Sequence, residues 1–112
     1  VKVLIARALM TNPELMILDE PSVYLDLAGR EFLLKTIEEL AATRPDLTMI
    51  FITQRIEDIL PVFDCGMILK SGQIVASGSR DEVLTEENLK NAFDLDIQLI
   101  RTDKGRLWTV IR

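Results

Sequence analysis

The sequence has little cysteine. Its one cysteine, Cys65, cannot form an internal disulfide. The apolar stretch around it, residues 63–69, predicts a buried thiol in a reducing compartment, which indicates the cytoplasm. No hydrophobic run approaches the ~20 residues that a membrane-spanning helix needs, and the first residues do not have the layout of a signal peptide. Any contact with a membrane is therefore expected to pass through a partner protein.

Positive charge is also scarce. The 13 lysines and arginines are outnumbered by 18 acidic residues, histidine is absent, and the formal net charge is -5. A surface that binds nucleic-acid phosphates needs clustered Lys and Arg, but here the basic residues are interspersed with acidic ones. Nucleic acid is therefore not an expected partner. Hydrophobic residues make up 48% of the 112-residue chain, which is enough for the core of one small domain and argues against disorder.

The apolar pattern of the first half predicts alternating helices and strands. Apolar residues have helical spacing over residues 1–10, and the short runs 15–18 and 47–52 are typical of strands buried on both faces, as in a parallel sheet. A helix over about 27–42, with Asp26 as its N-cap, separates the two runs. Strand, helix and strand in succession imply a right-handed crossover between parallel strands. The predicted fold class is α/β.

The second half has a different pattern, in which short apolar runs alternate with turn residues. Two pairs of runs predict β-hairpins, residues 64–69 with 73–77 and residues 97–101 with 107–111. Between them, Ser79 to Glu82 fits a capping box at the start of a short helix, and Thr85 caps a second helix. A short helical segment is also expected over 55–60. No clear linker divides the chain.

The most informative segment is the acidic pair Asp19-Glu20, which directly follows the apolar run 15–18. Two carboxylates therefore stand at the carboxyl end of a predicted parallel strand, where ligands bind in open α/β sheets. An arbitrary Asp-Glu pair in this position is more often a solvated loop than a site. The surrounding residues favour a site, because Pro21 fixes the backbone directly after the pair and a long helix follows residues 22–26.

Residues 18–26, Leu-Asp-Glu-Pro-Ser-Val-Tyr-Leu-Asp, resemble the Walker B motif and D-loop of ATP-binding cassette (ABC) ATPases, whose usual form is Leu-Asp-Glu-Pro-Thr-Ser-x-Leu-Asp. The resemblance continues in the family's order. Residues 5–9 resemble the helix after the signature motif, 49–53 the strand that leads into the switch loop, and 68–78 the hairpin that follows it. It implies a partial P-loop NTPase domain of ABC type, with residues 1–112 as the C-terminal portion of one ABC ATPase domain.

The resemblance implies roles for three acidic residues. Asp19 would hold Mg2+, usually through its water shell, and Glu20 would polarise the water that attacks the γ-phosphate of ATP. These roles suit the chemistry, since a hard cation prefers oxygen ligands and phosphoryl transfer depends on a positioned water. Asp26 would be a nucleotide-binding residue, and it would shape the D-loop that crosses to a second ABC ATPase domain. Its role as a helix N-cap is equally compatible.

Gln54 departs from the family. It follows Thr53, where the family normally has a histidine that contacts the γ-phosphate. Gln54 is retained as a catalytic candidate, because glutamine can donate a hydrogen bond to a phosphate oxygen, although it cannot carry a proton or a positive charge. Weaker stabilisation of the transition state is therefore expected. The alternative is that Gln54 is an ordinary polar loop residue.

The Walker A sequence Gly-x-x-x-x-Gly-Lys-[Ser/Thr] does not occur, and the five glycines are too scattered to build one. The Q-loop and the signature motif are absent as well. Residues 69–73 superficially resemble the signature Leu-Ser-Gly-Gly-Gln, but they follow the acidic pair and lie at a hairpin turn, whereas the signature precedes the pair and opens a helix. The signature would fall just before Val1, so we expect a portion of a longer protein that does not hydrolyse ATP alone.

As a function, the resemblance implies ATP binding and hydrolysis by a subunit that energises a membrane transporter, with ATP and Mg2+ as cofactors. The implied partners are a second ABC ATPase domain and a transmembrane permease, at the inner face of the cell membrane. The hairpin and helix over residues 72–84 are associated with importer-type subunits. Two alternatives remain open: a soluble ABC protein of translation or DNA repair, and a non-catalytic regulatory half-domain, which Gln54 and the missing phosphate loop favour.

Overall fold

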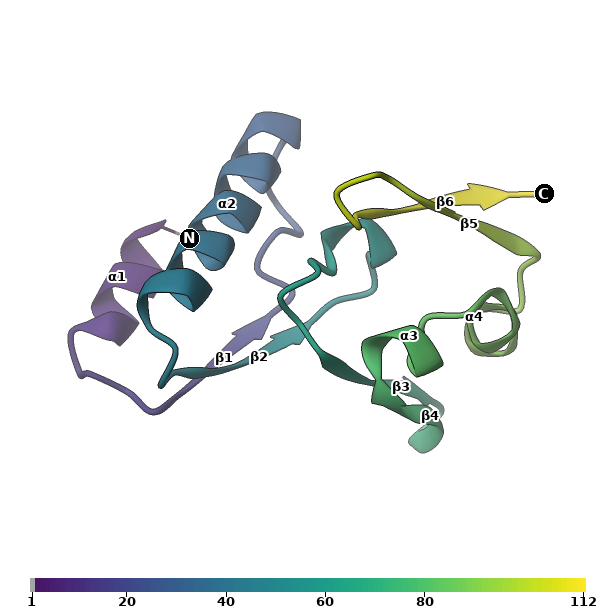
Figure 1. Cartoon of the computed structure of the whole chain (residues 1–112), viewed down its shortest axis with the longest axis horizontal. Coiled ribbons are helices and arrows are strands. Elements are labelled where there is room, and N and C mark those ends of the chain that lie inside the picture. Colours follow the sequence, from purple (N-terminus) through teal and green to yellow (C-terminus); the bar gives the residue numbers. More distant parts are fainter. Residues whose placement is uncertain (1) are drawn as a thin grey trace. The chain divides into compact units, whose positions relative to one another are not determined.

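The computed structural model describes the backbone of residues 2–112 and the side chains from residue 5 onward. The chain divides into two compact units, with the division between Asp58 and Ile59. Figure 1 shows the helices and strands of both units in chain order. Val1, the first residue of the predicted N-terminal helix, lies outside the described residues. Among the described residues, no helix is both long and apolar enough to cross a membrane.

The first unit has the strand, helix and strand that the sequence predicts. Its elements are α1 (Lys2–Leu9), β1 (Leu15–Asp19), α2 (Leu27–Thr43), β2 (Thr48–Ile52) and the 3-10 helix η1 (Ile56–Asp58). β1 and β2 pair in parallel, from Leu15 opposite Thr48 to Asp19 opposite Ile52. The 17-residue helix α2 connects them (Figure 1). The predicted crossover between parallel strands is therefore confirmed.

Helix α2 begins directly after Asp26, as predicted. The Asp26 carboxylate accepts a hydrogen bond from the Gly29 N–H at 2.7 Å, which satisfies one of the free amides of the first helical turn. Gly29 suits this contact, because a Cβ at that position would lie only 3.0 Å from Asp26 Oδ1. The buried residues of α2 are Leu33, Leu34 and Ile37.

The prediction that both strands are buried on both faces is wrong for the described residues. In β1, Met16 and Leu18 are buried, whereas Leu15 and Ile17 are 49% and 58% exposed. No residue of β2 is buried. Side chains alternate between the two faces of a sheet, so β1 has one buried face and one open face. An apolar run identifies a strand, but it does not reveal how many of its faces other elements cover.

The second unit contains two antiparallel hairpins with two short helices between them. Its elements are β3 (Cys65–Lys70), β4 (Gln73–Ser79), α3 (Arg80–Val83), α4 (Glu86–Phe93), β5 (Ile97–Arg101) and β6 (Leu107–Ile111). β3 pairs with β4, and β5 pairs with β6, as the sequence predicts. The turn between β3 and β4 has positive φ at both of its residues, 51° at Ser71 and 76° at Gly72. This is the backbone pattern of a tight two-residue hairpin turn.

Both predicted helix caps of the second unit are present. Ser79 Oγ accepts a hydrogen bond from the Glu82 N–H at 3.3 Å and donates to Glu82 Oε1 at 2.8 Å. Thr85 Oγ1 accepts from the Asn88 N–H at 3.1 Å. Each hydroxyl satisfies an amide that the first turn of a helix leaves without a partner. The local sequence therefore determines where α3 and α4 begin.

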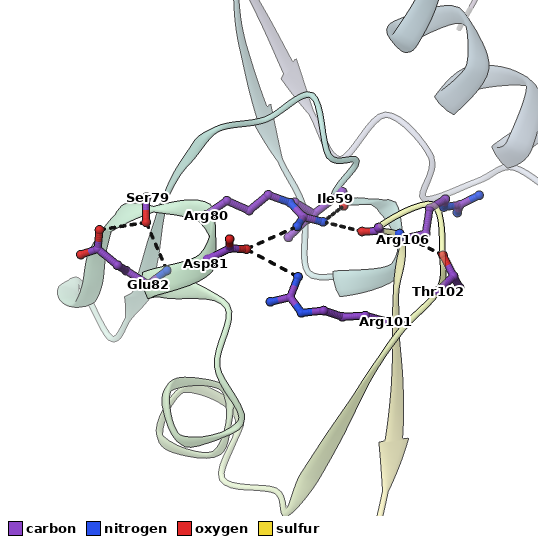
Figure 2. A network of polar contacts seen from close by, with 9 residues as sticks. Ile59, Ser79, Arg80, Asp81, Glu82, Arg101, Thr102 and Arg106 are labelled. Atoms are coloured by element: carbon purple, nitrogen blue, oxygen red, sulfur yellow. Dashed lines mark hydrogen bonds and ion pairs between the residues drawn. The ribbon is translucent and has the colours of Figure 1, made fainter.

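Arg80, at the start of α3, joins separate segments of the second unit (Figure 2). Its guanidinium donates hydrogen bonds to the carbonyl oxygens of Ile59 and Gly105, at 3.1 and 3.3 Å. Asp81 forms ion pairs with Arg80 and Arg101, at 3.9 and 3.5 Å. Burial lowers the pKa of Arg80, and the positive charge of Arg101 lowers it further. The network fastens the turn between β5 and β6 to the start of α3.

The predicted burial of Cys65 is wrong, because its side chain is exposed. Cys65 opens β3, and its thiol donates a hydrogen bond to Asp64 Oδ1 at 3.3 Å. This hydrogen bond and the negative charge of Asp64 raise the pKa of the thiol. Met67 and Leu69, two and four residues further along the strand, are exposed as well. The apolar neighbourhood in the sequence therefore reflects an open face of the hairpin.

Candidate functional site

The acidic pair and the loop that contains Gln54 lie at the same edge of the parallel strand pair. β1 ends at Asp19 and β2 ends at Ile52, and these two residues are opposite each other. One residue further, the Glu20 N–H donates a hydrogen bond to the Ile52 carbonyl at 2.7 Å. The hydrogen bonding between β1 and β2 therefore continues to Glu20. The segments that begin at Pro21 and at Thr53 leave the sheet next to each other.

The backbone of Glu20 is in the left-handed region, with φ of 45°. A glutamate rarely adopts this conformation, which costs on the order of 1–3 kcal/mol, and the following Pro21 restricts the residue before it further. Two backbone hydrogen bonds hold it there: the Glu20 N–H donates to Ile52, and the Glu20 carbonyl accepts from the Val23 N–H at 3.3 Å. The chain reverses sharply directly after the end of β1.

A hollow of about 170 Å3 opens at this edge. Its lining comes from the two segments that follow β1 and β2, namely Glu20, Ser22, Val23, Thr53, Gln54 and Arg55. Small-molecule pockets have volumes of roughly 300–1,000 Å3, so the hollow has the size of part of such a pocket. Two of the predicted site residues, Glu20 and Gln54, are therefore brought together although 34 positions separate them in the sequence.

The other two predicted site residues do not line the hollow. Asp19 is exposed at the end of β1, and Asp26 is exposed at the N-terminus of α2, where its carboxylate is bonded to Gly29. Glu20, the residue after Asp19 and outside β1, lines the hollow, whereas Asp19 does not. The N-cap role of Asp26 is observed directly, and its predicted role toward nucleotide stays a prediction.

A side-chain turn shapes the loop that contains Gln54. The hydroxyl of Thr53 accepts a hydrogen bond from the Arg55 N–H at 2.9 Å. Such a bond between a threonine and the residue two positions later stabilises a tight turn. Gln54 is the middle residue of this turn, where its side chain is exposed at the wall of the hollow.

The sequence analysis missed Asp58, which ends η1 and contacts Ser22, one of the residues that line the hollow. Asp58 has no exposed surface, and its Oδ2 accepts a hydrogen bond from the Ser22 hydroxyl at 2.6 Å. The same oxygen lies 3.4 Å from the Nε of Arg55. The sequence contained a signal for the pairing of Arg55 with Asp58, because an Arg and an Asp three residues apart on one helical turn are close enough to form an ion pair.

The oxygen donors of this edge suit a magnesium ion that is bound together with a phosphate ligand. Among the described residues, no group of three or more His, Cys, Asp or Glu side chains could hold a metal ion by itself. Mg2+ is usually held by one or two carboxylates, with waters and substrate phosphates as its other ligands. The exposed carboxylate of Asp19 is a suitable donor for that arrangement.

No protein-family model matches the sequence. Similar curated proteins nevertheless cover most of the chain. An ABC transporter ATP-binding protein of Bacillus subtilis, YlmA, is 44% identical over 99 residues, which are 88% of this chain and 38% of the relative. An ABC transporter ATP-binding protein of Streptococcus mutans is 34% identical over 105 residues, 94% of this chain and 40% of the relative. The molybdenum import ATP-binding protein ModC of Escherichia coli is 39% identical over 83 residues, 73% of this chain and 23% of ModC.

A solved structure is similar over nearly the whole chain. It is an inward-facing conformation of a metal-chelate type ABC transporter, with a TM-score of 0.80 and 28% sequence identity, and the match covers 98% of this chain and 43% of that one. This match confirms the predicted fold class, a partial α/β domain with parallel strands. The chain spans about two fifths of the length of the first two curated relatives.

Proposed function

The chain belongs to the family of ABC transporter ATP-binding proteins, and from this membership we propose that the complete protein binds and hydrolyses ATP to drive a membrane transporter. The observation that carries the proposal is the meeting of Glu20 and Gln54 at one hollow, beyond the carboxyl ends of two parallel strands. Ligands bind at this edge in α/β sheets. We further propose that residues 1–112 form the C-terminal portion of one ABC ATPase domain.

In the proposed reaction, Glu20 accepts a hydrogen bond from the attacking water and polarises it. Glu20 is suited to this task, because its half-buried carboxylate lines the hollow and its backbone is locked by hydrogen bonds on both sides. A base in a fixed position contributes roughly 100-fold to 10,000-fold to such a step. Gln54, on the opposite loop, donates a hydrogen bond from its side-chain amide to an oxygen of the γ-phosphate.

We propose that Asp19 holds Mg2+ together with the phosphates of ATP. The ion would neutralise the negative charge that develops on the phosphate oxygens during transfer. Asp19 is the last residue of β1, directly before Glu20. Its side chain is exposed at the edge where a phosphate can approach. The Walker A loop that would cradle the phosphates does not occur in this sequence, so residues 1–112 supply only one side of the proposed nucleotide site.

The proposed partners are a second ABC ATPase domain and a transmembrane permease. Asp26 supports the first, because its bond to Gly29 fixes the end of the loop 22–26 that would face the second domain. The names of the relatives, which are transporter ATP-binding proteins, support the second and disfavour a role in translation or DNA repair. With these partners, the protein would be cytoplasmic and peripheral at the inner face of the membrane.

A non-catalytic regulatory role is the second candidate, and Gln54 is the observation that favours it. Glutamine replaces a histidine that could carry positive charge toward the phosphate, so binding should suffer less than chemistry. A protein that binds ATP with high affinity but turns it over very slowly would have this second function. Measurements of nucleotide affinity and of turnover in the same protein therefore separate the two candidates.

The test of the first function is the substitution Glu20→Gln in the full-length protein, with ATP turnover and ATP affinity as the two measurements. The amide keeps the size of the side chain and removes its charge, so turnover should fall ~100-fold or more while affinity stays nearly unchanged. Asp103→Asn is a matched control, since Asp103 is exposed in the turn between β5 and β6. A fall in turnover of less than about threefold would exclude the proposed role of Glu20.

A further inference from the structure

A buried hydrogen bond links the two loops that line the hollow, and the proposed chemistry does not use it. The hydroxyl of Ser22 donates to Asp58 Oδ2 at 2.6 Å, across 36 positions of sequence. Ser22 is 2% exposed and Asp58 has no exposed surface. A distance of about 2.6 Å is at the short end of the range for hydrogen bonds between two oxygens.

The carboxylate of Asp58 has few other partners. Arg55 Nε lies 3.4 Å from Asp58 Oδ2 and forms an ion pair with it. Neither Arg55 Nε nor Asp58 Oδ1 has a hydrogen-bond partner among the residues that the structure describes. A buried carboxylate with sparse partners is costly, and two apolar side chains of similar volume would serve stability as well or better. Stability therefore does not account for this pair.

The position of the pair suggests what it does. Ser22 lies two residues after Glu20, and Asp58 lies four residues after Gln54. At the sheet, the two loops are joined by the hydrogen bond from the Glu20 N–H to the Ile52 carbonyl. At their far ends, the bond between Ser22 and Asp58 joins them again. Glu20 and Gln54 therefore lie between two hydrogen bonds that join their loops, one at the sheet and one at the far ends of the loops.

We propose that Ser22 and Asp58 are positioning residues, whose buried hydrogen bond holds the loop of Glu20 at a fixed distance from the loop of Gln54. This inference rests on the proposed function. Asp58 is not among the residues that line the hollow, and the hydroxyl of Ser22 is bonded to Asp58. The pair acts by keeping the carboxylate that polarises the water and the amide that bonds the phosphate in one geometry, since a displacement of about 1 Å costs on the order of 100-fold in rate.

The first test compares three variants of the full-length protein in steady-state ATP hydrolysis. Ser22→Ala removes the hydrogen bond and should lower kcat about tenfold or more, with less than about threefold change in KM, because positioning affects the transition state more than binding. Ser22→Thr keeps the hydroxyl and should restore most of the rate. Ser77→Ala, an exposed serine on β4, is the control. A kcat of Ser22→Ala within about twofold of the parent overturns the inference.

The second test separates positioning from folding stability. Ser22→Ala leaves the buried Asp58 carboxylate without its donor, so the protein should unfold at a lower temperature. The double variant Ser22→Ala/Asp58→Leu also removes the buried charge, and its unfolding temperature should recover. The inference predicts that kcat stays low in this double variant. Recovery of kcat along with the unfolding temperature would show that the pair only stabilises the fold, and would overturn the inference.

The two proposals fail in different ways when Glu20→Gln is measured beside these variants. A parent protein without ATP turnover overturns the proposed function and this inference with it. An active parent that Glu20→Gln inactivates, together with a fully active Ser22→Ala, overturns the inference alone. Loss of turnover in both Glu20→Gln and Ser22→Ala, with rescue by Ser22→Thr, supports both proposals.

Discussion

The two units of the molecule use their polar residues for different purposes. In the second unit, charged side chains connect elements: Lys70 bonds to Asp94 at 2.9 Å, and Glu86 accepts from the Leu99 N–H at 2.9 Å and from Arg112 at 3.3 Å. The first unit has such a contact too, from Arg44 to Asn12 at 3.2 Å, but its polar residues also gather at the edge where β1 and β2 end, around the hollow. The polar contacts of the second unit connect elements, and those of the first unit also shape a hollow.

Two energetically costly features lie at or next to the hollow. At the hollow, Glu20 has a left-handed backbone before a proline, and the buried Asp58 carboxylate has one free oxygen among the described residues. Strained backbone and sparsely partnered buried groups are typical of functional sites, where geometry matters more than local stability. Positive φ also occurs in the second unit, at Ser71, Gly72 and Asp94, but these residues are in a hairpin turn and at a helix end, where it is ordinary.

After substitution of Glu20, the largest expected effect on chemistry is at Gln54. Gln54→Ala in the full-length protein should lower ATP turnover about tenfold or more, because it removes the proposed hydrogen-bond donor to charge that develops in the transition state. Gln54→His should raise turnover or leave it unchanged, since imidazole can donate and also carry positive charge. Gln98→Ala, at an exposed position of β5, is the control in the second unit.

The pH profile gives a second measurement at Gln54. Between about pH 6 and 8, the parent should show no step that belongs to this position, because glutamine does not titrate, whereas Gln54→His can introduce one. Equal turnover of the parent and Gln54→Ala would mean that residue 54 makes no useful contact with the phosphate. That result would favour the regulatory function, in which the site binds ATP without efficient hydrolysis.

In the second unit, Arg80→Met should have the largest effect on stability. Arg80 is 11% exposed and bonds the carbonyl oxygens of Ile59 and Gly105, so its loss should lower the free energy of unfolding by about 2–3 kcal/mol. Lys35→Met, at an exposed position of α2, should change it by less than about 0.5 kcal/mol. Urea unfolding of the full-length protein measures both. Similar losses for the two variants would contradict the idea that the Arg80 network holds its unit together.

Glycine substitutions compare the strained residues of the two units. Glu20→Gly and Ser71→Gly should each raise the free energy of unfolding by about 0.5–1 kcal/mol, because glycine adopts positive φ without the steric penalty of a side chain. Glu20→Gly should also abolish ATP turnover, whereas Ser71→Gly should not affect it. Thermal unfolding measures the change in stability of both variants, and an ATP turnover assay measures the change in activity. A Glu20→Gly variant that is no more stable than its parent would show that the Glu20 backbone is not strained.

The smallest expected effect is a pH dependence of stability from Glu86. The hydrogen bond from the Leu99 N–H, followed by the hydrogen bond and the positive charge of Arg112, lowers the pKa of Glu86 below its usual value of 4.5. A lowered pKa in the folded state means that the contribution to stability is complete above about pH 4.5 and is lost as pH falls through the folded pKa. Glu86→Gln should therefore flatten the fall in unfolding temperature between about pH 5 and 3. An unchanged slope would contradict this role of Glu86.

Several features of the molecule could be predicted because their causes are local. Asp26, Ser79 and Thr85 cap their helices through bonds to amides three residues away, so a short stretch of sequence contains the whole interaction. The same holds for the hairpin turn at Gly72. The acidic pair could be placed at a strand end for the same reason, since the apolar run and the two carboxylates are adjacent in the sequence.

The amino-acid sequence by itself determined the order of helices and strands, their caps and their turns. Other features were decided only by the tertiary structure. The sequence could not determine that β1 has an open face or that Cys65 is exposed, because burial depends on which elements cover a strand. Nor could it pair Ser22 with Asp58, since a contact across 36 positions exists only once two parallel strands have brought their loops together. Each candidate residue has a local signal in the sequence, but the meeting of Glu20 and Gln54 at one hollow is a property of the fold.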